Sequence, residues 1–116
     1  MSNMKISVGG AMEQAAARRF IDAWHRGERG EVFQERHLAF ESWETLARVL
    51  SGKRMEMLRY VRRHKVGSVR ALAKALGRDY SNVHADVQAL TQAGLLDVTR
   101  GGVRADYDAI ETRIAI

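Results

Sequence analysis

The sequence predicts a mainly α-helical fold with a small β component, and three observations support this prediction. Residues 68–92 contain two apolar stripes at helical spacing, separated by a short turn. A further helical stripe precedes them, and a short alternating run with a Gly-Gly tip follows them. This order of elements is typical of a winged helix-turn-helix. We therefore expect that fold, with an N-terminal strand–helix extension and a C-terminal strand.

The sequence of the N-terminal half predicts the strand and the helix of the extension. Residues 5–8 alternate like a strand, and apolar residues at helical spacing over 12–24 predict a helix that ends near Gly27. The polar residues 28–36 predict a loop. Ser42 is expected to cap the next helix. The inner stripe of that helix comprises Trp43, Leu46, Ala47 and Leu50.

A basic helix is expected next, followed by the first helix of the pair. The basic helix should bury Met57, Leu58 and Val61. Some of its cations are expected to approach the DNA backbone and others to keep the helix soluble; they are Lys53, Arg54, Arg59, Arg62, Arg63 and Lys65. Ser68 is placed to cap the next helix, and Gly77 to end it in the left-handed conformation. Its apolar stripe consists of Val69, Leu72, Ala73 and Leu76.

The second helix of the pair, residues 80–93, is the expected recognition helix. Val83, Val87 and Leu90 should face inward. Ser, Asn, Gln and Ala side chains, which can contact base edges in the major groove, should face outward. The outward residues are Ser81, Asn82, Ala85, Gln88, Ala89 and Gln92. Asp86, on one flank, is expected to pair with a neighbouring arginine.

Residues 97–105 predict a hairpin whose tip is Arg100-Gly101-Gly102. A basic tip can contact phosphate or enter the minor groove beside the recognition helix. The alternative is a helical hairpin and a β-hairpin within some other small globular domain.

The net charge of +5 is concentrated in this region. Residues 53–104 contain eleven basic and four acidic side chains, whereas residues 1–52 contain seven of each. Such a patch suits phosphate neutralisation, although it could also serve solubility. Arg70, Lys74 and Arg78 are the best placed to contact phosphate. The candidate DNA-binding residues are Ser68, Arg70, Lys74, Arg78, Tyr80, Ser81, Asn82, His84, Ala85, Gln88, Arg100 and Arg104.

Residues 1–41, 42–107 and 108–116 are expected to form the extension, the DNA-binding domain and the C-terminal strand. The extension is a candidate for dimerisation or partner binding. Ile110, Thr112, Ile114 and Ile116 alternate with polar residues or alanine, as in a strand. The terminal strands could pair within one chain or across two. We expect a homodimer, because many such proteins bind two half-sites about one DNA turn apart.

Composition excludes several classes of function. There is no cysteine, and none of the GxxxxGK[ST], GxGxxG, GxSxG or HExxH motifs occurs. We therefore expect no enzyme activity, no cofactor and no metal site. The chain shows neither a signal peptide nor an apolar run of membrane-spanning length, so we expect a soluble, cytoplasmic protein with no membrane partner.

The phrases SGKRMEMLRYV, SVRALAKALGRDYSNVHADVQAL, QAGLLDV and YDAIETRIAI resemble a family of small prokaryotic MarR-like predicted transcriptional regulators. The resemblance includes KISVGG and LAFESWETLARVL, so it covers most of the chain. It implies a winged-helix protein that binds double-stranded DNA, and membership of a toxin–antitoxin pair. The resemblance also implies Lys or Arg at the positions of Ser81, Ala85 and Gln88, so the outward face of this chain is less basic than the family pattern.

Two functions follow as expectations. The first is a transcriptional repressor or autoregulator. The second is an antitoxin that binds and neutralises a small toxin, with Trp24 or Trp43 as a partner anchor rather than as part of the core. One protein can perform both roles.

Overall fold

The computed structural model describes residues 2–9 and 34–116, and the helix predicted over residues 12–27 lies outside them. The described residues form four helices and five strands. They belong to two compact units, one comprising Arg48–Asp106 and the other comprising Met1–Ala47 with Tyr107–Ile116.

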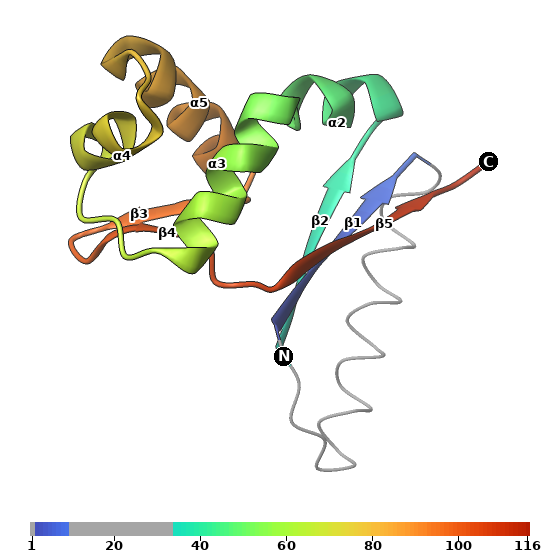
Figure 1. Ribbon diagram of the computed structural model, residues 1–116. Helices are drawn as coiled ribbons and strands as arrows, with labels where there is room; N and C mark the ends of the chain where they lie inside the picture. Colours follow the sequence, from blue (N-terminus) through green and yellow to red (C-terminus); the bar gives the residue numbers. More distant parts are fainter. Residues whose placement is uncertain (1, 10–33) are drawn as a thin grey trace. The chain divides into compact units, whose positions relative to one another are not determined.

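The second of these units contains a parallel sheet. Strands β1 (Ser2–Val8), β2 (Gln34–Phe40) and β5 (Ala109–Ile114) lie side by side in the order β2-β1-β5 (Figure 1). The terminal strands β1 and β5 therefore pair within one chain. Met4, Ile6 and Val8 of β1 are at most 2% exposed, and these three side chains form the apolar face of the sheet at its centre.

The structure corrects two expectations in this unit. Gln34–Phe40 is a strand, so the loop predicted over 28–36 extended too far. The sequence QERHLAF lacks strict alternation, and its extended conformation depends on hydrogen bonds to β1, a distant partner in the sequence. Helix α2 (Trp43–Val49) buries Leu46, but Trp43 is 53% exposed rather than part of an inner stripe. Ala47 is exposed as well, so Leu46 is the one buried side chain of this seven-residue helix.

The unit Arg48–Asp106 contains α3 (Gly52–Arg63), α4 (Val69–Leu76), α5 (Tyr80–Gln92) and a hairpin of β3 (Asp97–Thr99) and β4 (Gly102–Arg104). This order confirms the predicted basic helix, helix pair and hairpin. The predicted core residues of all three helices are buried or half-buried. The fully buried ones are Met57, Leu58, Val61, Leu72, Ala73, Val83, Val87 and Leu90.

Candidate nucleic-acid interface

Local capping determines where α4 and α5 begin and end. The Ser68 hydroxyl accepts a hydrogen bond from the Ala71 amide at 3.0 Å, and the Asp79 carboxylate accepts one from the Asn82 amide at 3.2 Å. Each side chain satisfies an amide that the first helical turn leaves unpaired. Gly77 ends α4 with φ +64°, a conformation that glycine adopts without strain. A turn of three residues therefore joins the two helices, as predicted.

The two faces of α5 differ in chemistry. Val83, Val87 and Leu90 are at most 3% exposed and anchor the helix. The opposite face is exposed and carries hydroxyl, amide and methyl groups. Its exposed residues are Ser81, Asn82, Ala85, Gln88 and Gln92, whereas Ala89 is half-buried.

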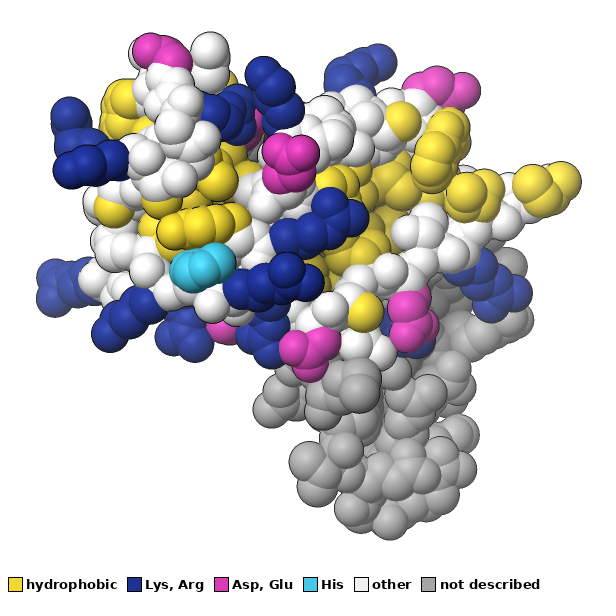
Figure 2. Space-filling model, in the orientation of Figure 1, with side chains coloured by type: hydrophobic (Ala, Val, Ile, Leu, Met, Phe, Trp, Pro, Cys, Tyr) yellow, Lys and Arg dark blue, Asp and Glu magenta, His cyan; other side chains and the backbone are white. Residues whose placement is uncertain are grey.

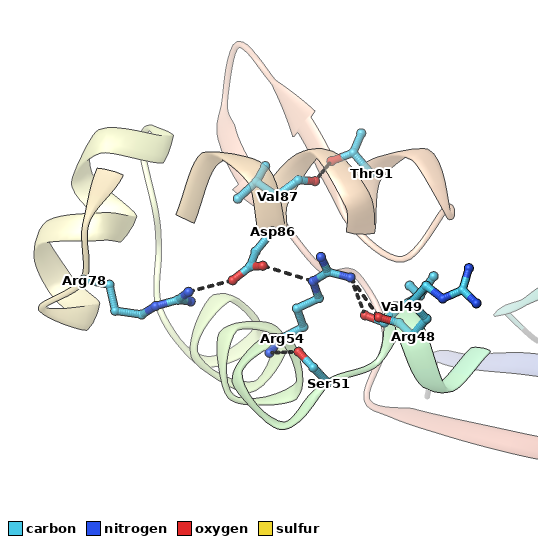
Figure 3. A network of polar contacts seen from close by, with 8 residues as sticks. All are labelled: Arg48, Val49, Ser51, Arg54, Arg78, Asp86, Val87 and Thr91. Atoms are coloured by element: carbon cyan, nitrogen blue, oxygen red, sulfur yellow. Dashed lines mark hydrogen bonds and ion pairs between the residues drawn. The ribbon is translucent and has the colours of Figure 1, made fainter. Parts of the chain in front are cut away.

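Asp86, the one acidic residue between Tyr80 and Gln92, is held by two arginines. Its carboxylate accepts hydrogen bonds from Arg54 Nε at 3.0 Å and from Arg78 Nη2 at 2.8 Å (Figure 3). The three side chains are only 15%, 21% and 22% exposed respectively. This network joins α5 to α3 and to the turn, and it confirms the expectation that Asp86 pairs with an arginine.

Arg54 extends the network beyond α5. Its Nη1 donates to the carbonyl oxygens of Arg48 at 3.2 Å and Val49 at 3.1 Å, which lie at the end of α2 (Figure 3). One guanidinium therefore satisfies both a carboxylate and carbonyls that have no helical partner. Arg78 was expected to contact phosphate, but its guanidinium is directed at Asp86.

The charge state of Asp86 follows from these contacts. Partial burial alone would raise the pKa of the carboxyl group, because it disfavours the charged form. The hydrogen bonds from Arg78 and Arg54, together with their positive charges, outweigh burial and hold the pKa below its ordinary value. Asp86 is therefore ionised at neutral pH, and its negative charge is compensated by two cations.

Aromatic and basic side chains flank the start of α5. Tyr80 is 42% exposed, and the Arg70 guanidinium of α4 lies 5.0 Å from the centre of its ring. His84, one turn further along α5, has its ring centre 5.7 Å from that of Tyr80. The cation–π contact holds Arg70 beside the exposed face of α5. Lys74 is exposed on α4.

The hairpin is attached to the segment between α3 and α4. Val103 of β4 donates its amide proton to the Val66 carbonyl oxygen at 2.9 Å. Gly102 has φ +113°, and a Cβ atom on it would lie 1.9 Å from the same oxygen, so no other residue fits this position. The tip presents Arg100 to solvent, and Arg104, 61% exposed, forms an ion pair with Asp106 at 3.1 Å.

Hollows lined by described residues border these elements. An open cleft of about 390 Å³ lies between the end of α3 and β4, and its charged lining includes Arg62, Arg63, Lys65 and Arg104. A shallower apolar hollow of about 260 Å³ lies between α5 and β3, where Val69, Val87 and Val98 line it. In the sequence, the consecutive basic residues 62–65 are the one feature that could have indicated this cleft. Their position beside the hairpin depends on the fold.

Basic side chains are frequent on the exposed surface of this unit (Figure 2). The sequence-predicted candidates from Ser68 to Arg104 all lie within Arg48–Asp106. The Ser68 hydroxyl is occupied as a helix cap. Arg70, Tyr80, Ser81, Asn82, Ala85 and Gln88 are exposed on α4 and α5, whereas His84 is half-buried.

Two other features, metal-binding clusters and membrane-spanning helices, are both absent among the described residues. In residues 2–9 and 34–116, no group of three or more His, Asp or Glu side chains is arranged to hold a metal ion. Within the same ranges, none of the helices combines the length and the apolar character that crossing a bilayer requires.

Comparison with known proteins assigns the chain to a family. No curated protein matches it. The model of the HVO_A0114 family matches residues 49–112, which include α3, α4, α5, the hairpin and most of β5. Because this match covers more than half of the sequence, the chain belongs to the HVO_A0114 family.

Proposed function

We propose that this protein is a sequence-specific DNA-binding transcriptional regulator of the winged helix-turn-helix class. In this proposal, α5 is the recognition helix that enters the major groove. The β3–β4 hairpin is the wing, which contacts the backbone or the minor groove. The proposal includes a cytoplasmic location and a role as a repressor or autoregulator.

The exposed face of α5 is the observation that carries the proposal. It presents amides at Asn82 and Gln88, a hydroxyl at Ser81 and a methyl group at Ala85. Amides can form paired hydrogen bonds with adenine, and a methyl group can contact thymine. The single acid of the helix, Asp86, is compensated by Arg54 and Arg78, so it adds no uncompensated negative charge next to phosphate.

The surrounding charge supports the same proposal. Residues 53–104 contain eleven basic and four acidic side chains. Arg70 and Lys74 are exposed on α4, and Arg100 is exposed at the hairpin tip. Cations on both sides of a polar helix can position it against a duplex without reading sequence. The resemblance to MarR-like regulators is consistent with this arrangement.

A second candidate function rests on Trp43. This side chain is 53% exposed on α2, although tryptophan is more often largely buried. Exposed tryptophans are frequent anchors of protein interfaces. An antitoxin that neutralises a small toxin could use this residue and could also repress its own operon. Loss of toxin binding in a Trp43→Ala variant that still binds DNA would support this second role.

Selection of binding sites from a random DNA pool, followed by an Asn82→Ala variant, tests the leading proposal. The variant keeps its helix cap, because the bond to Asp79 uses the Asn82 amide of the main chain. We expect a loss of about 1–3 kcal/mol on the selected site and little loss on random DNA.

Lys74→Ala is the matched control, because it should weaken binding to both DNAs equally. Equal losses on both DNAs for Asn82→Ala would show that Asn82 does not contact bases. Failure to select any sequence would contradict the proposal as a whole.

A further inference from the structure

Strand β5 forms an exposed edge of the sheet. The strand pairs with β1 in parallel, from Asn3 opposite Ala109 to Val8 opposite Ile114. On its other side, β5 has no partner strand among residues 2–9 and 34–116. Every residue of β5 is exposed except the half-buried Ile110. The opposite edge strand, β2, is half-buried or buried from Arg36 to Phe40.

One hydrogen bond establishes which backbone groups of β5 are unused. The Ala115 amide donates to the Val8 carbonyl oxygen at 3.0 Å, so residue 115 faces β1. Because successive residues of a strand point their amide and carbonyl groups to opposite sides, residues 109, 111 and 113 also face β1. The groups of Ile110, Thr112 and Ile114 therefore point outward, and they are available to another strand.

The side chains of β5 divide in the same alternating way. Ile110, Thr112 and Ile114 are in register with Met4, Ile6 and Val8, so they continue the apolar face of the sheet. Ile114 is nevertheless 45% exposed. Apolar surface thus reaches the end of the chain, where hydrophobic side chains project (Figure 2).

The other face of β5 carries one acid and one base. Glu111 accepts hydrogen bonds from Lys5 and, at 3.1 Å, from Asn3 of the neighbouring strand. Arg113 forms no ion pair with any residue in the described ranges. The strand therefore presents opposite charges two residues apart, on either side of Thr112.

We propose that β5 is a self-association edge, to which a second copy of this chain adds its own β5 in antiparallel orientation, centred on Thr112. In that register Glu111 opposes the partner's Arg113, and Ile110 opposes the partner's Ile114. Opposite charges and apolar pairs directly across two strands both stabilise an antiparallel pair. Two-fold symmetry repeats each pair, so the edge is complementary to itself.

The available backbone groups and the charges restrict the register. In the antiparallel pair, residues whose amide and carbonyl groups point outward must lie opposite each other. The two-fold axis therefore passes through a residue and not between two residues. Centring on Glu111 or on Arg113 opposes like charges across the axis, which destabilises the pair. Centring on Ile110 or on Ile114 places a charged residue opposite alanine. Of the five candidate centres, residues 110–114, only Thr112 places Glu111 opposite the partner's Arg113.

This inference goes beyond DNA binding and does not depend on it. It supplies a surface for the dimer expected from the sequence, by continuing one sheet across two copies. Its test therefore uses the purified full chain without DNA, with self-association measured by sedimentation velocity over a range of concentrations.

Two charge reversals test the register. Glu111→Arg places an arginine opposite the partner's Arg113, and Arg113→Glu places two glutamates opposite each other, so each variant alone should dimerise at least about tenfold more weakly. An equimolar mixture of the two variants restores both ion pairs, so it should form heterodimers with nearly wild-type affinity. Recovery on mixing also shows that both variants are folded.

Thr112→Pro and Glu41→Arg complete the test. Proline at 112 removes an outward amide, which β1 does not use, and it should reduce dimerisation at least about tenfold. The control Glu41→Arg changes an exposed acid outside β5 and should leave dimerisation unchanged. A wild-type chain that stays monomeric would overturn the proposal. So would single reversals without effect, or a mixture without recovery.

Discussion

The exposed face of α5 and the exposed edge of β5 present different kinds of binding groups. The main-chain groups of α5 are paired within the helix, so what it presents to solvent is side chains such as Asn82 and Gln88. The edge of β5 presents the main chain itself, at Ile110, Thr112 and Ile114. Side chains on a helix can distinguish base pairs, whereas an unpaired strand edge is complementary to another strand.

The two surfaces also differ in what holds them. Helix α5 is anchored by Val83, Val87 and Leu90 and by the contacts of Asp86 with α3 and the turn. Strand β5 is held mainly by its ladder with β1. Substitutions that disrupt tertiary contacts should therefore destabilise the α5 region. Substitutions that alter the charges or backbone amides of β5 should instead affect pairing along its edge. The predictions below test that distinction.

Gly102→Ala should have the largest effect. A methyl group at this position would lie within 1.9 Å of the Val66 carbonyl oxygen, and φ is +113°. Either the hairpin separates from Val66 or the backbone changes conformation, at a cost of about 3 kcal/mol in the free energy of unfolding. Urea unfolding followed by circular dichroism measures this loss.

Gly101→Ala is the matched control for Gly102→Ala. Its nearest neighbour would be the Thr99 hydroxyl at 3.5 Å, an ordinary contact, and its φ is not positive. We expect a change near zero. Equal stabilities of the two variants would show that the hairpin is not held against Val66. Folded Gly102→Ala protein should also dimerise like the wild type, because its change lies outside β5.

Asp86→Asn should have the second largest effect. It leaves the Arg54 and Arg78 guanidinium groups without their anionic acceptor, at a cost of about 1–3 kcal/mol in the free energy of unfolding at neutral pH. The pKa of Asp86 is lower in the folded than in the unfolded chain, so the folded chain binds fewer protons than the unfolded chain near this pKa. The stabilisation is therefore complete above the ordinary carboxyl pKa of about 4 and disappears as the pH falls below the folded-state value.

Unfolding measured from pH 7 to pH 3 checks this prediction. The difference between wild type and Asp86→Asn should shrink as the pH falls below about 4. Asp106→Asn makes the same chemical change in an exposed pair with Arg104 and should change stability by less than about 0.5 kcal/mol. A difference that persists unchanged at pH 3 would show that the Asp86 charge does not stabilise the fold.

The elements around α5 could be predicted because their signals are local. Ser68, Gly77 and Asp79 act within three or four residues of their own positions, as caps and turn residues do. Pairing of Asp86 with an arginine could be expected as well. Its partner Arg54 could not be identified, because the two residues lie 32 positions apart in the sequence and meet only in the folded chain.

The sheet could be predicted much less well, because parallel pairing joins distant segments. Alternation predicted the strand in residues 5–8 and the strand at the C-terminus, but not that they would be adjacent and parallel. Strand β2 lacks alternation, and its first three residues, 34–36, were predicted as the end of a loop. The assignment of Trp43 to an inner stripe was wrong, because an apolar stripe shows which side chains share a face and not whether another element covers that face.

Arg100→Ala combined with Arg104→Ala should have the smallest effect on free energy, and it tests how the surface around α5 uses its charges. Both side chains are exposed, and neither lies on α5. If the hairpin contacts phosphate, the double variant should bind all DNA sequences more weakly and lower the slope of log affinity against log salt by about one to two per chain. The preference for the selected site should stay unchanged, in contrast to Asn82→Ala. An unchanged slope in the folded variant would remove the hairpin from the DNA interface and leave α5 as its main element.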